Sequence, residues 1–170
     1  MNLPPGIVYT TKSIATHIYG ATDKSTLKAK DLILSNLNTS DSTLTLSGKE
    51  SILNATNIVL SKSGEATLIV SNGLLISESL KMAEKKGSES TLNLNGGTLK
   101  VKKIEKGLGA STLNLNSGKL VLQEINTTIE NNGATIAPGQ SPGILNISGD
   151  LNLNSGILEM EVAKVTDNKI

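Results

Sequence analysis

The stretch "STLNLNGGTLKVKKIEKGLGASTLNLNSGKLVL", residues 90–122, contains the same short unit twice. In each copy, leucines alternate with asparagines, which is the periodicity of a strand with one buried face and one exposed face. A glycine ends the alternation, and a second alternating run of apolar residues follows it. The unit returns after 21 residues, so the stretch predicts a repeat architecture made of strands.

Related units occur along most of the chain: "STLTLSG" at 42–48, "ATLIVSNG" at 66–73 and "DLNLNSG" at 150–156. A third short apolar patch, such as Ile58/Leu60 or Leu80/Met82, follows the second run of several units. Three short strands per 21–24 residues predict an all-β fold, a right-handed parallel β-helix of about six coils. The threonines that open the first four units lie 24, 24 and 21 residues apart: Thr43, Thr67, Thr91 and Thr112.

The repeat also divides the chain. Residues 1–24 are poorly patterned, and residues 25–170 form the predicted β-helix region. The gap from Leu113 to Leu151 is 38 residues, so we expect an inserted turn segment near 126–143. Residues 77–87 favour a helix by composition, but they align with the third strand of other units and are expected to be a strand. Leucine-rich repeats have a similar period but a different leucine spacing.

The composition excludes several functions. The chain has no Phe, Trp or Cys, its sixteen positive charges are all Lys, and its net charge is +1. A near-neutral chain without Arg, and with Tyr9 and Tyr19 as its only aromatic residues, is not expected to bind nucleic acid. Disulfides and thiolate metal sites need Cys. No apolar run reaches the roughly 18–20 residues of a transmembrane helix.

One stretch matches a catalytic pattern. Residues 139–143, "GQSPG", have the G-x-S-x-G spacing of a hydrolase nucleophile elbow around Ser141. Such an elbow is followed by a helix, whereas Pro142 and a strand pattern follow here. The single histidine, His17, precedes the serine and has no obvious orienting carboxylate. The stretch therefore predicts a Pro/Gly turn and no nucleophile.

Carboxylates offer a second possible chemistry, because parallel β-helices also include polysaccharide lyases and glycosidases. A glycosidase needs two carboxyl groups about 5–10 Å apart, and Glu159 and Glu161 alternate on one predicted strand face. Two acids on a terminal strand more often form a solvated row, so we expect no catalytic residue, no cofactor and no metal ion. The aspartates that a calcium-dependent lyase would cluster are scattered: Asp23, Asp31, Asp41, Asp150 and Asp167.

Two polar rows could instead form a binding surface. Asn95, Asn116 and Asn154 each lie two residues before a glycine of their unit. They predict a ladder of side-chain amides that bond from coil to coil, with an exposed ligand-binding row as the alternative. The threonine column suggests a flat ice-binding array, but it is single and ends after four residues.

Taken together, "STLNLNGGTLKV…STLNLNSGKLVL" resembles the autotransporter-associated β-strand repeats of bacterial type V secretion passengers. The segment "GATIAPGQSPGILNISGDLNLNSGILEMEVAKVTDNKI", residues 133–170, looks like the passenger segment that reads G-x-L-x-P-G-x-S-P-G-x-L-x-I-x-G-D-L-x-L. The likeness covers residues 42–170 and is most specific over 133–156. Residues 1–24 have no counterpart in this pattern.

The resemblance implies a non-catalytic β-helical passenger that is exported and displayed on the bacterial cell surface or secreted. Such passengers often act in adhesion to host surface or matrix molecules, or in self-association. The full-length protein would carry a C-terminal translocator β-barrel, so we expect these 170 residues to be a segment of a longer passenger. An open C-terminal coil would leave an unpaired strand edge, so we expect self-association or fraying there.

Overall fold

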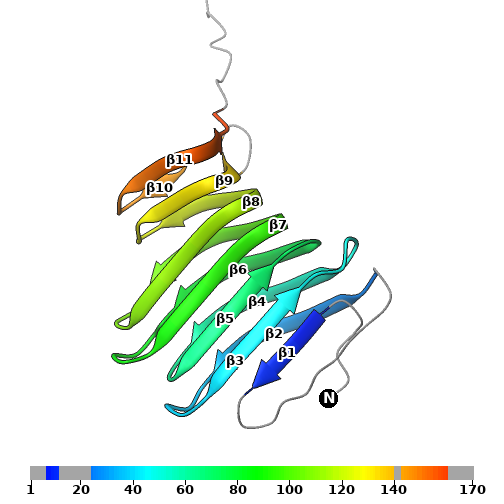
Figure 1. Ribbon diagram of the computed structural model, residues 1–170, viewed down its shortest axis with the longest axis vertical. Helices are drawn as coiled ribbons and strands as arrows, with labels where there is room; N and C mark the ends of the chain where they lie inside the picture. The colour runs from blue at the N-terminus through cyan, green and yellow to red at the C-terminus, as the bar shows by residue number, and fades with distance from the viewer. Residues whose placement is uncertain (1–6, 12–23, 140–142, 161–170) are drawn as a thin grey trace, which may run out of the picture.

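Alternating residues form strands throughout the part of the chain that the computed structural model describes, residues 7–11, 24–139 and 143–160. The strands belong to one sheet that winds around a common axis (Figure 1), and no helix occurs among the described residues. They are β1 (Ile7–Thr11), β2 (Thr26–Ser35), β3 (Asp41–Leu46), β4 (Ile52–Ser61), β5 (Glu65–Val70), β6 (Leu74–Met82), β7 (Glu89–Lys106), β8 (Ala110–Ile125), β9 (Ile129–Pro138), β10 (Asn146–Ile147) and β11 (Leu151–Leu158).

The strands stack into coils with three faces. Face A contains β3, β5 and the first parts of β7, β8, β9 and β11. Face B contains the first parts of β2, β4 and β6 and the later parts of β7, β8, β9 and β11. Face C contains the second parts of β2, β4 and β6, the ends of β7 and β8, and β10. The rungs pair in parallel, which confirms the predicted β-helix of about six coils.

The register of face A follows the sequence repeat. Thr43 pairs with Thr67, Thr67 with Thr91, and Thr91 with Thr112. Each pair joins residues that open consecutive units, so the spacing of the units is the length of a coil. Residues 77–87 also follow the repeat, because β6 extends to Met82 and a turn follows it. Their helical propensity is overridden by the stacking of like strands.

The core lies inside the coils and consists of aliphatic columns. Each rung turns every second side chain inward, and the same inward position on the next coil holds another aliphatic residue. Burying one such side chain contributes roughly 1.5–3 kcal/mol, so thin stacked layers supply a core without aromatic residues. One column on face A is fully buried and consists of Leu46, Val70, Leu94 and Leu115.

The prediction of an inserted turn segment near 126–143 is wrong for most of these residues. Residues 129–138 form β9, which pairs with β8 on one side and with β11 on the other. Glu130 pairs with Asn114, 16 residues earlier, so this coil is shorter than those before it. The 38-residue gap in the repeat therefore contains one additional coil, which β9 begins.

Asn131 is the reason that this coil cannot be recognised from the leucine repeat. It occupies the inward position where Leu115 stands on the preceding rung, and its side chain is fully buried. The Asn131 carboxamide oxygen accepts hydrogen bonds from the backbone N–H groups of Gly133 and Ala134, at 3.2 and 2.9 Å. Its NH₂ group donates to the carbonyl of Ala134 at 2.9 Å. A polar residue therefore replaces the leucine and closes the turn between faces A and B.

Within the poorly patterned segment 1–24, residues 7–11 form a strand. Strand β1 pairs antiparallel with β3, from Ile7 opposite Leu46 to Thr11 opposite Ser42. It lies at the N-terminal end of the coils, on the edge that the first rung of face A would otherwise leave free (Figure 1). A five-residue strand has too few alternations to identify from sequence alone.

Candidate interaction surfaces

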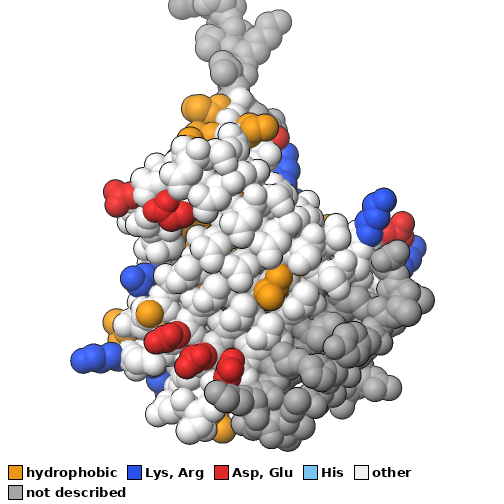
Figure 2. Space-filling view, viewed as in Figure 1, with side chains coloured by type: hydrophobic (Ala, Val, Ile, Leu, Met, Phe, Trp, Pro, Cys, Tyr) orange, Lys and Arg blue, Asp and Glu red, His pale blue; other side chains and the backbone are white. Residues whose placement is uncertain are grey.

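The outer surface of face A is a polar surface with few charged side chains. The threonine column lies along it, and next to this column Thr45, Ile69, Asn93 and Asn114 occupy one row of the register. Figure 2 shows this face toward the viewer, with few coloured side chains in its middle. Stacked hydroxyl and amide groups on parallel rungs can offer hydrogen bonds to a neutral polar partner.

The asparagines on this surface bond to one another from coil to coil. The Asn116 amide donates to the Asn95 side-chain oxygen at 2.8 Å, and the Asn114 amide donates to Asn93 at 2.7 Å. Asn154 donates in the same way to Asn132 at 2.9 Å. The predicted coil-to-coil bond between Asn95 and Asn116 is therefore confirmed, whereas Asn154 bonds to Asn132, on the coil between Asn116 and Asn154. Asn132 could not be predicted to take part in this bonding, because the leucine repeat is interrupted in its coil.

Acidic residues form a row at the start of face A. Asp41, Glu65 and Glu89 are in register on β3, β5 and β7, and Figure 2 shows acidic side chains gathered near the beginnings of these strands. Rungs lie about 4.8 Å apart, so like charges stack directly. Within the described residues, no group of three or more His, Cys, Asp or Glu is arranged to hold a metal ion.

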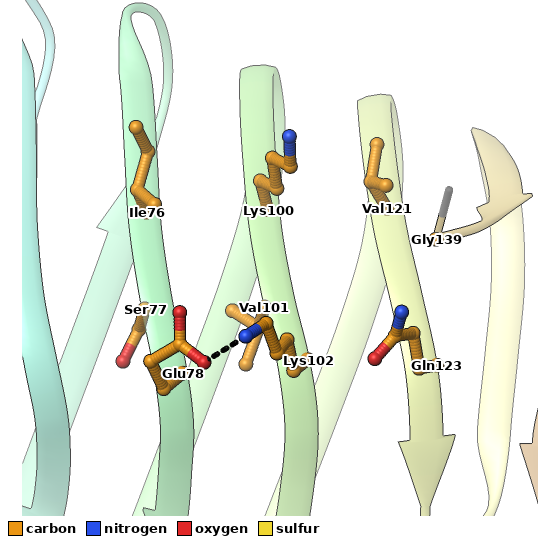
Figure 3. A pocket seen from close by; sticks show the side chains of 9 residues that line it. All are labelled: Ile76, Ser77, Glu78, Lys100, Val101, Lys102, Val121, Gln123 and Gly139. Carbon is orange, nitrogen blue, oxygen red and sulfur yellow. Dashed lines mark ion pairs between the residues drawn. The ribbon is translucent and has the colours of Figure 1, made fainter. Parts of the chain in front are cut away.

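A groove of about 290 Å³ crosses the outer surface of face B. Ile76, Lys100 and Val121 lie in one row across three coils, and Glu78, Lys102 and Gln123 lie in the next (Figure 3). The Glu78 carboxylate forms an ion pair with the Lys102 ammonium group. Ser77, Val101 and Gly139 complete the lining. The groove thus combines apolar side chains with paired charges.

Gly139 shapes one end of this groove. A Cβ atom at this position would lie 2.5 Å from Cγ of Gln123, closer than two carbon atoms can approach. The glycine therefore leaves room for the Gln123 side chain beside the last residue of β9. Of the five residues in the "GQSPG" stretch, the structure describes Gly139 and Gly143.

The candidate catalytic residues are only partly placed. Ser141, His17 and Glu161 lie outside the described residues. Glu159 is exposed, and its carboxylate accepts an ion-paired hydrogen bond from the Lys119 ammonium group at 2.7 Å. Asp31 accepts a hydrogen bond from the Asn57 amide at 2.7 Å. These contacts give Glu159 and Asp31 structural partners between coils.

Lys103 is the one described residue whose pKa clearly shifts. Its ammonium group lies 3.1 Å from a carboxylate oxygen of Glu124 on the next coil and 3.1 Å from one of Glu105 on its own strand. The hydrogen bond to Glu124 first, and then the one to Glu105, raise the pKa of Lys103 above its ordinary value. The group acts as a bridge between two coils of face C.

Comparison of the chain with family models, with curated proteins and with solved structures finds no match in any of the three. Among the described residues there is also no helix of the length and apolarity that crossing a membrane requires. The repeat architecture and its polar surfaces are therefore the observations from which a function is inferred.

Proposed function

We propose that the chain is a non-catalytic β-helical passenger segment of a bacterial autotransporter, exposed on the cell surface or secreted, and serving as a structural stalk in adhesion or self-association. The observation that carries this proposal is the stack of T-L-x-L rungs on face A, followed by the "APGQSPG" stretch at 137–143. A solenoid of this kind holds an elongated surface rigid without disulfides, which suits a chain that crosses an outer membrane unfolded.

The polar surface of face A supports an adhesive role. Its amides and hydroxyls are arranged on successive rungs, and the Asn93–Asn114 and Asn95–Asn116 bonds hold their orientation. A host surface or matrix molecule that lies across the rungs would meet the same polar groups at each coil. Adhesion would then arise from many weak contacts rather than from one deep site.

Surface display tests the proposal. Residues 1–170 are placed between a signal peptide and a translocator barrel in a Gram-negative bacterium, and intact cells are probed with protease and with immobilised matrix proteins and polysaccharides. We expect display of the folded segment and attachment of the cells. Asn114→Lys on the outer surface of face A should reduce attachment, whereas Asn54→Lys at an exposed position of face B should not. Display without any attachment or clumping would contradict the proposal.

The in-register threonines favour ice binding as a second candidate. Thr43, Thr67 and Thr91 stack on parallel rungs, which supplies one column of the hydroxyl array that would face an ice surface. Thermal hysteresis that disappears in Thr91→Leu would support this function. Absence of hysteresis in the unchanged chain would remove it.

A further inference from the structure

The two ends of the solenoid differ in how well their edge strands are protected against pairing with a strand of another molecule. At the C-terminal end, β11 pairs with β9, and no other described strand covers its second edge. The strand sequence, "LNLNSGIL", contains no charged residue and no proline. Four large apolar side chains of the last coil are exposed: Ile144 (73%), Leu153 (49%), Ile157 (59%) and Met160 (79%). Figure 2 shows apolar side chains gathered at this end.

The N-terminal end is protected in two ways. Strand β1 covers the first rung of face A. The first rung of faces B and C is β2, which carries the exposed charges Lys28, Lys30 and Asp31. Charged side chains on an edge strand disfavour pairing with another chain, because the approaching strand would have to desolvate them. Natural β proteins use both devices, a covering strand and edge charges, and among the residues that the structure describes neither is found along β11.

We propose that two copies of this chain associate through their C-terminal ends, with β11 of one copy running antiparallel to β11 of the other. This inference rests on the self-association that is part of the proposed function, and it names the surface and the partner. Stacking the C-terminal end of one copy on the N-terminal end of the next would bring β11 against β1 and the charges of β2. Pairing the two C-terminal ends instead joins two uncharged edges about a twofold axis.

Pairing of β1 with β3 shows that a rung of face A accepts an antiparallel strand. All five residues of β1 have a partner on β3, so the coil geometry allows antiparallel hydrogen bonding at an outermost rung. The same arrangement at the opposite end would satisfy the free N–H and C=O groups of β11. It would also remove Leu153 and Ile157 from water, which is the favourable term in the association.

Sedimentation velocity of the 170-residue chain over a range of concentrations tests the proposal. We expect a monomer–dimer equilibrium without larger species. Leu153→Lys and Ile157→Lys should each weaken the dimer at least about tenfold, since each would place an unpaired charge in the interface. Ile33→Lys on β2 is the matched control, because Ile33 is 43% exposed at the opposite end, and it should leave the dimer unchanged.

Cross-linking gives a second readout that does not depend on a destabilising charge. The chain has no cysteine, so single-cysteine variants report one position each. Among single-cysteine variants at successive positions of β11, the one at the twofold axis should form a disulfide-linked dimer under mild oxidation, because it lies opposite its own copy and opposite residues of an antiparallel pair have Cα atoms about 4.5–5.5 Å apart. Lys28→Cys on β2 should stay monomeric under the same conditions.

Three results would overturn the inference: a monomer up to about 100 µM, open-ended growth into larger species, or equal sensitivity to Ile33→Lys. Failure of the proposed function has a different signature, the absence of attachment by displayed cells. If displayed cells attach to matrix molecules but the chain is monomeric in solution, the proposed function is supported and the dimerisation inference is contradicted.

Discussion

Buried serine hydroxyls without partners are the most unusual feature at the scale of single residues. Ser42, Ala66, Ser90 and Ser111 follow one another in a single register column on face A. Within the described part of the chain, the three hydroxyl groups are buried and form no hydrogen bond. The alanine in the same column shows that the position does not require a hydroxyl.

Ser90→Ala should therefore stabilise the protein. Removing a buried, unpaired hydroxyl relieves a desolvation penalty of about 1–3 kcal/mol, and a gain of about 1 kcal/mol in the free energy of unfolding is expected. Urea denaturation measures it. Ser35→Ala is the control and should destabilise, because the Ser35 hydroxyl donates to the carbonyl of Ser63 at 2.8 Å. A loss of stability in Ser90→Ala would contradict the prediction.

Two glycines have similar backbone angles but different steric surroundings. Substituting each of them therefore distinguishes the strain of a left-handed backbone from a steric clash. Gly64 and Gly87 have φ of 76° and 79°. A Cβ atom on Gly64 would lie 2.4 Å from the carbonyl oxygens of Leu37 and Ser40, whereas one on Gly87 would meet nothing within 4 Å. Gly87→Ala should destabilise by about 1–2 kcal/mol, the strain of a left-handed backbone, and Gly64→Ala by clearly more. Equal losses in thermal denaturation would contradict this account.

Bridging charges act at the scale of neighbouring strands. The pKa of Lys103 is raised, above all by Glu124 on the adjacent strand, so the protonated lysine is favoured by folding. Its contribution to stability is complete below the ordinary lysine pKa of 10.5 and is lost as the pH rises through the higher folded-state pKa.

The stability of the unchanged chain should therefore fall more steeply above pH 10.5 than that of Lys103→Gln. Chemical denaturation at a series of alkaline pH values measures the difference between the two proteins. Lys100→Gln serves as the control for simple loss of charge, because Lys100 on face B forms no ion pair with another described residue. Parallel pH profiles for Lys103→Gln and the unchanged chain would contradict the prediction.

Strands could be predicted from sequence wherever leucine alternated with a polar residue and a glycine followed. Leu92/Leu94 and Leu113/Leu115 fall in β7 and β8 as the alternation predicted. β9 was missed because Asn131 takes an inward position and replaces leucine packing with turn hydrogen bonds. β1 was missed because its pairing is with a distant strand, and no local pattern encodes that. The groove on face B depends on outward residues of three coils, which the register alone brings together.

At the scale of the whole molecule, each coil contacts mainly the coils before and after it. Stability in such a solenoid is a sum of coil and interface contributions, so coils with two neighbours are more stable than a coil with one. Backbone amides of β6, β7 and β8 should therefore exchange hydrogen much more slowly than those of β10 and β11, where side chains are more exposed. Hydrogen exchange followed by mass spectrometry measures this gradient. Uniform protection from β2 to β11 would contradict it.

The orientation of the interstrand bonds also has a mechanical consequence. Because each rung bonds to the next along the solenoid axis, a force that pulls the two ends apart along this axis loads one rung at a time. The molecule would then yield by peeling, coil by coil, and each step would release the length of chain stored in one turn. Such a tether lengthens progressively under load and does not fail in a single event.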